Sequence, residues 1–118
     1  SAKDTAARFF GDIKYQIVNL KSKEELKNGV WIVPMDGTKL GNPYYTAPGP
    51  ERHMILVIGY DVKTDELITN DPGTKRGRGY RYKLDVFWNA IRDYPTGDHE
   101  PITEVNKNAI LVMEPASE

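Results

Sequence analysis

Residues 53–73 read HMILVIGYDVKTDELITNDPG, and this stretch decides the fold of the chain. An apolar run at 54–58 is followed by a polar segment at 61–65 and by a second strand-like run at 66–70. Two such runs around a short polar turn are typical of a β-hairpin. We interpret residues 54–58 as a strand buried on both faces, because the run is continuously apolar. The turn-forming Asp71-Pro72-Gly73 ends the second strand, since proline fixes φ and glycine tolerates positive φ.

The hairpin brings a histidine and an aspartate together. If the turn centres near Val62 or Lys63, paired residues have numbers that sum to about 125. His53 then lies opposite residue 72, with Asp71 at the same open end, and opposite residues have Cβ atoms about 5 Å apart. A carboxylate at that distance can fix the tautomer and orientation of the ring. The other ring nitrogen can then act as a general base or in an ion pair.

Structural explanations for the two residues have to be weighed against this functional one. Asp71 before Pro72-Gly73 is a common turn residue whose side chain can cap the turn. His53 at the head of a buried strand can be an ordinary, partly buried ring. We favour a functional site because both residues lie at one end of one hairpin, beside the long loop 36–52. Loops of that length in small domains are more often functional than idle.

The remaining patterns complete one α+β domain, residues 1–118, dominated by antiparallel strands. Ser22 and Glu25 match a capping box at the start of a helix. Alternating or continuous apolar residues predict further strands, and 3.6-residue spacing predicts helices. The expected strands are 14–18, 30–35, 79–84 and 108–113, and the expected helices are 4–10, 22–29 and 85–94, the last with Val86, Phe87, Ala90, Ile91 and Tyr94 on its apolar face.

Composition excludes several classes of protein. The net charge of −1 over 118 residues argues against general binding to nucleic acid. The basic residues at 75–83 are best interpreted as the solvent face of an edge strand. The longest apolar run is too short to span a membrane, and residues 1–11 lack the apolar core of a signal peptide. Neither a cytoplasmic nor an exported location follows. The absence of cysteine excludes disulfides and thiol nucleophiles within the chain.

The motifs around the hairpin resemble those of a known family. HMILVIGYD at 53–61 and ITNDPGT at 68–74 resemble the "H…V.GYD…NDPG" signature of C39-like peptidases, which are bacterial cysteine peptidases of papain-like fold. LKNGVWIVP at 26–34 is similar to the family's preceding strand, and GNPYY at 41–45 to its loop before the histidine. The resemblance implies a papain-like α+β fold: an antiparallel half-barrel sheet with a few short helices.

The resemblance also implies roles. The family hydrolyses peptide bonds with a Cys–His–Asp triad, in which His53 matches the histidine and Asp71 the aspartate. Asn42, Tyr44 and Tyr45 would line a cleft for a peptide or protein substrate, although the two tyrosines could equally pin the loop to the body. No cofactor and no metal are expected. The lone His99, between two carboxylates, is interpreted as a solvated loop residue.

The chain departs from the family pattern at the nucleophile. It has no cysteine, its one glutamine (Gln16) lies in a predicted strand, and the serines (Ser1, Ser22, Ser117) offer no replacement. Residues 1–118 would then be the C-terminal part of such a domain, inactive alone. The alternatives are a non-catalytic domain that holds a peptide with loop 36–52, and a different small α+β fold. Without the cysteine helix, an apolar sheet face should be exposed, so we expect self-association or a partner segment.

Overall fold

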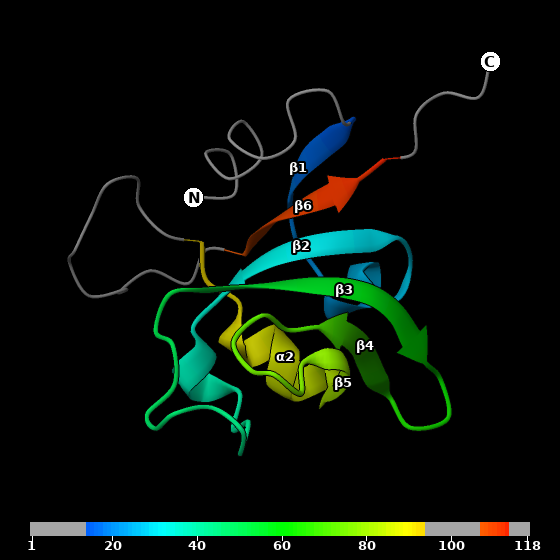
Figure 1. Ribbon diagram of the computed structural model, residues 1–118. Helices are drawn as coiled ribbons and strands as arrows, with labels where there is room; N and C mark the ends of the chain where they lie inside the picture. The colour runs from blue at the N-terminus through cyan, green and yellow to red at the C-terminus, as the bar shows by residue number, and fades with distance from the viewer. Residues whose placement is uncertain (1–13, 94–106, 114–118) are drawn as a thin grey trace.

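The computed structural model describes residues 14–93 and 107–113, which build one open, six-stranded antiparallel sheet with a short α-helix on one face (Figure 1). The strand order is β1-β6-β2-β3-β4-β5. The predicted helix at 4–10 and His99 lie outside the described residues. None of the described helices is long and apolar enough to cross a membrane. The elements are β1 Tyr15–Asn19, the 3₁₀ helix η1 Lys23–Lys27, β2 Val30–Met35, the 3₁₀ helix η2 Gly37–Lys39, β3 His53–Asp61, β4 Glu66–Asn70, β5 Arg78–Lys83, α2 Leu84–Ala90 and β6 Asn108–Val112.

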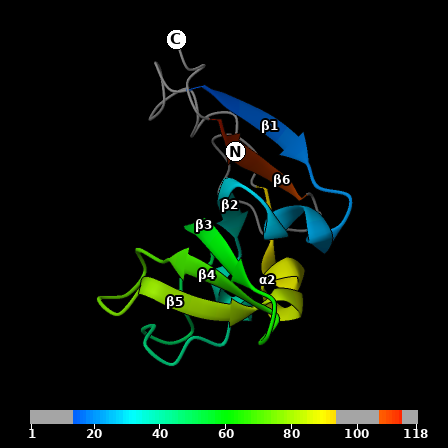
Figure 2. The same ribbon diagram turned by 90° about the vertical axis from the view of Figure 1, so that its right-hand side faces the viewer.

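The predicted hairpin is β3–β4, and its register contains a bulge. Asp61 pairs with Glu66 at the turn, but the register shifts by one residue between Val57 and Gly59. Beyond the bulge, Val57 pairs with Thr69 and Leu56 with Asn70, toward the open end of the hairpin. Figure 2 shows β3, β4 and β5 side by side in the sheet. Beyond the bulge the extrapolated partner of His53 is Gly73, one residue from the predicted residue 72. A bulge of this kind cannot be read from an alternating pattern alone.

The two faces of β3 differ in burial. Ile55 and Val57 are fully buried against the core that includes Phe87 of α2. On the other face, Met54 and Leu56 are only partly buried and Ile58 is 43% exposed. The prediction of a strand buried on both faces is therefore wrong for the described part of the chain. The reason is that, among the described elements, α2 covers one face only, so the continuous apolar run also supplies partly exposed residues to the other face.

Helix α2 is shorter than predicted. It ends at Ala90 because Ile91 leaves the helix to form a β-bridge with Met35, and the Arg92 backbone N–H donates to Pro34 O at 3.0 Å. Pairing with the end of β2 thus replaces the last predicted helical turn. Val86, predicted as a core residue, is 41% exposed. The buried residues of this segment are Leu84, Phe87, Ala90 and Ile91, while Tyr94 lies outside the described residues.

The capping box at the start of η1 is confirmed. Ser22 Oγ accepts a hydrogen bond from the Glu24 backbone N–H at 3.2 Å, and Glu25 Oε2 accepts one from the Ser22 backbone N–H at 3.1 Å. The predicted short helix is a 3₁₀ helix. It ends at Lys27, two residues before Gly29, whose φ of 90° turns the chain into β2.

Candidate functional site

His53 and Asp71 meet at the open end of the hairpin. His53 is the first residue of β3 and Asp71 directly follows β4. The imidazole Nε2 lies 2.6 Å from Asp71 Oδ1, and the two side chains are 9% and 0% exposed. A distance this short between buried groups is that of a charge-assisted hydrogen bond. The two residues therefore form a dyad rather than two separate surface side chains.

The Asp71 carboxylate accepts hydrogen bonds on both oxygens. Oδ1 takes one from His53 Nε2 and one from the Gly73 backbone N–H at 2.8 Å. Oδ2 takes one from the Tyr82 hydroxyl at 2.5 Å and one from the Tyr45 hydroxyl. Burial raises the pKa of Asp71, but the hydrogen bonds, with His53 first, outweigh it and lower the pKa to about 2. The carboxylate is charged at neutral pH.

The protonation of Asp71 decides the tautomer of His53. An ionised carboxylate has no proton to donate, so the proton between Asp71 Oδ1 and His53 Nε2 belongs to the ring. In the neutral ring Nδ1 is then the basic nitrogen. The geometry thus assigns the Nε2–H of His53 to the hydrogen bond with Asp71 Oδ1.

Two tyrosines hold the carboxylate from the interior. Burial, followed by the hydrogen bond to Asp71, raises the pKa of Tyr45 and of Tyr82 well above the usual tyrosine range. Both hydroxyls therefore stay protonated and act as donors. Their oxygens lie 3.1 Å apart, and Asn42 Nδ2 donates to the Tyr82 oxygen at 2.8 Å. The Asp71 carboxylate is thus the final acceptor of a hydrogen-bond network in which Asn42 donates to Tyr82, and both tyrosines donate to Asp71.

The three predicted substrate-binding residues have different surroundings. Asn42 is buried, and its Oδ1 accepts from the Tyr44 backbone N–H at 2.8 Å. The rings of Tyr45 and His53 pack in a T-shaped arrangement, with centroids 5.7 Å apart. Only Tyr44 is widely open, at 50% exposure, with the Arg76 guanidinium 5.0 Å from its ring centroid. Asn42 and Tyr45 support the dyad from within, whereas Tyr44 faces outward from the same loop.

Two contributors were missed by sequence reasoning. Tyr82 comes from β5, and the alternation of 79–84 showed only that it shares a face with Tyr80. The Gly73 backbone N–H was treated as part of a turn. Proximity of Tyr82 to Asp71 depends on how β5 pairs with β4, where Tyr82 lies opposite Leu67. No local signal in the sequence specifies that register.

Metal binding has no candidate in the described segments. No group of three or more His, Cys, Asp or Glu side chains in residues 14–93 and 107–113 is arranged to hold an ion.

A family model described as the Peptidase_C39 like family matches residues 4–96. The chain belongs to this family. The matched segment includes the dyad, the loop that carries Tyr45, and all of β5. This Peptidase_C39-like chain contains no cysteine and so lacks the nucleophile of the family's peptidases. No curated protein and no solved structure gives a significant match to it.

Proposed function

We propose that the chain is the C-terminal part of a papain-like, C39-type peptidase domain and supplies the histidine and aspartate of its site. The observation that carries the proposal is the set of four donors on Asp71, which keeps the carboxylate ionised and presents it to His53 Nε2. A carboxylate that served only as a turn cap would need the Gly73 N–H alone. Three further side chains donate to Asp71: His53, Tyr45 and Tyr82. The two tyrosines come from distant segments, and this arrangement is suited to holding the imidazole in one orientation.

The proposed chemistry is peptide-bond hydrolysis with a thiol from a segment outside these 118 residues. His53 Nδ1 accepts the thiol proton, and the thiolate attacks the peptide carbonyl carbon. The imidazolium then gives that proton to the leaving amine as the C–N bond breaks and a thioester remains. Water, deprotonated by Nδ1, attacks the thioester and releases the acid and the thiol. Asp71 stays ionised throughout and orients the ring.

Tyr44 is the residue that we propose to contact the substrate. It stands on the loop that carries Tyr45, and its ring is half exposed. Its edge-to-face packing on Tyr80, with centroids 6.1 Å apart, keeps one side of the ring fixed. An aromatic surface held in this way can pack against a peptide side chain at little entropic cost.

The test compares the chain alone with the chain joined to the cysteine-bearing segment that its gene is expected to encode ahead of Ser1. The chain alone should not cleave peptides. The longer protein should cleave them, and His53→Ala or Asp71→Ala should abolish turnover while His99→Ala, at the one other histidine of the chain, leaves it unchanged. A coding sequence without a cysteine codon ahead of Ser1 would contradict the proposal.

The absence of cysteine favours a second candidate, a non-catalytic domain that binds peptides through loop 36–52. In that case Tyr44→Ala should weaken binding of a peptide library hit, and His53→Ala should leave its affinity unchanged. Peptide cleavage by the longer protein would exclude this candidate.

A further inference from the structure

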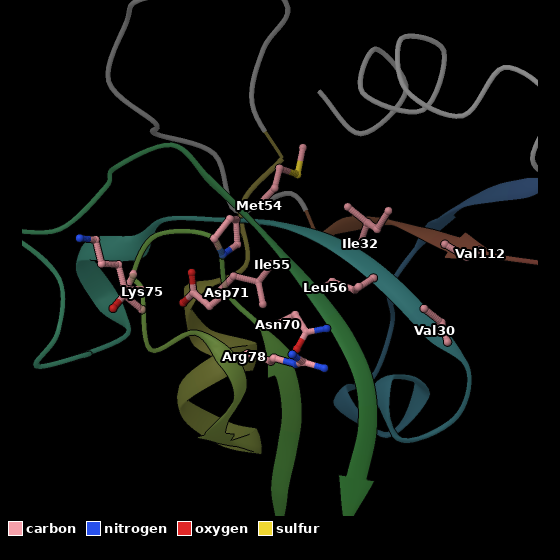
Figure 3. A pocket seen from close by; sticks show the side chains of 12 residues that line it. Val30, Ile32, Met54, Ile55, Leu56, Asn70, Asp71, Lys75, Arg78 and Val112 are labelled. Atoms are coloured by element: carbon pink, nitrogen blue, oxygen red, sulfur yellow. The ribbon is translucent and has the colours of Figure 1, made fainter.

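The sheet face opposite α2 carries an open apolar groove of about 780 Å³. Its floor comes from side chains of β2, β3 and β6 that point away from the core. Figure 3 shows Val30 and Val112 at one end of this groove and Asp71 and Lys75 at the other. Its lining includes Ile32, Met54, Leu56, Asp71, Lys75 and Arg78.

The part of the groove away from Val30 and Val112 has an excess of positive charge. Lys75 and Arg78 border it and are exposed. Within the described residues, neither makes a salt bridge. The single carboxylate among the described lining residues, Asp71, is already engaged by four donors. A partner with its own carboxylates would complement this end.

The position of the groove in the sheet selects the kind of backbone that can occupy it. The floor lies over β6, β2 and β3, which are interior strands of the described sheet, and the edges are β1 and β5. Backbone groups of the interior strands already pair with their neighbours, so an extended peptide finds no partners there. A helix satisfies its own backbone and packs its apolar stripe on a sheet face.

We propose that this groove docks an amphipathic helix with an apolar stripe over Ile32, Met54 and Leu56 and carboxylates over Lys75 and Arg78. A second copy of the chain fits less well, because a two-fold contact through this face buries the same basic end twice. The described lining residues offer no available carboxylate to pair with it. The proposal concerns the face opposite the helix-covered core and does not depend on peptide hydrolysis.

The test uses two synthetic helices of about 16 residues, long enough to cross the floor at ~1.5 Å per residue. Both carry one leucine stripe, and they differ only in having two glutamates or two lysines at one end. Binding is measured by fluorescence anisotropy to the chain and to its Lys75→Glu/Arg78→Glu variant, whose changed residues are exposed and should not disturb folding. The glutamate helix should bind the unmodified chain about tenfold more tightly than the variant, and the lysine helix should show the opposite preference.

Two further variants separate the groove from the dyad and from dimerisation. Leu56→Asn should weaken both helices, whereas His53→Ala should leave their affinities unchanged, so failure here and failure of the proposed hydrolysis are distinguishable. Absence of binding, or affinities that do not depend on the matched charges, would overturn the proposal. So would a dimer in sedimentation that Leu56→Asn dissociates, because a second copy would then occupy the groove.

Discussion

Gly73 lies so close to His53 that a Cβ atom on it would come within 2.9 Å of both Nε2 and Cε1 of the imidazole ring. The same Cβ would be 3.0 Å from Cε1 of Tyr45, whose ring packs against the histidine in a T-shaped arrangement. The ring is therefore confined by Gly73, Tyr45 and the Asp71 carboxylate together. The φ of Gly73 is not positive, so it is the close approach of its neighbours, rather than the turn, that requires a glycine here.

Replacing Gly73 by alanine should displace the imidazole from Asp71. We expect a loss of about 1–3 kcal/mol in the free energy of unfolding, because neither ring can retreat without strain. Urea denaturation measures this loss, and the NMR signal of the Nε2 proton reports whether the hydrogen bond survives. Gly59→Ala is the matched control, since its Cβ would make only ordinary contacts with Ile68, at 3.6 Å or more. Equal stabilities of the two variants would argue against the confinement.

Removing the Tyr82 hydroxyl should destabilise the fold as well as the dyad. In Tyr82→Phe, Asp71 Oδ2 loses one of its two donors and Asn42 Nδ2 loses its acceptor, both in buried surroundings. The expected cost is about 1–3 kcal/mol in the free energy of unfolding. Tyr80→Phe serves as control, because the Tyr80 hydroxyl makes no hydrogen bond within the described residues, and it should cost less than about 0.5 kcal/mol. Similar costs for the two variants would contradict the network.

The lowered pKa of Asp71 predicts a loss of stability in acid. The folded pKa of about 2 lies below the ordinary value of 3.8, so the unfolded chain binds the proton more readily. The contribution is complete above pH ~4 and is lost as the pH falls toward 2, amounting to about 2 kcal/mol. Asp71→Asn should flatten this part of the pH profile of unfolding. Measuring in about 1 M salt removes contributions from exposed pairs such as Asp61–Arg81 and leaves that of buried Asp71.

The orientation of α2 predicts opposite results for two adjacent residues. Phe87 is fully buried against the sheet, and Phe87→Ala should cost about 3–5 kcal/mol in the free energy of unfolding. Val86 is largely exposed, and Val86→Ala should cost less than about 0.5 kcal/mol. Thermal unfolding of both variants checks this. A large loss of stability in Val86→Ala would instead support the prediction from residue spacing that Val86 lies on the apolar face of the helix.

Much of the fold was predictable because it is local. Strand β2 was predicted with its observed bounds, and the capping box at Ser22 was found from four consecutive residues. Helix α2 was predicted too long because the competing partner of Ile91 is Met35, which is far away in sequence. Propensity alone cannot weigh a helical turn against a distant β-bridge.

The sequence by itself determined the hairpin, the meeting of His53 and Asp71 at its open end, and the lack of a thiol. A short turn allows only a few registers between the two strands that it joins, so the distance between residues at the open end follows from local pairing. Tertiary structure alone decided that Tyr82 and Asn42 complete the support of Asp71, and that the described elements cover one face of β3 only in part. Those relationships depend on the register of β5 and on the side that α2 covers. Each is a contact between distant segments, where packing rather than local preference selects the partner.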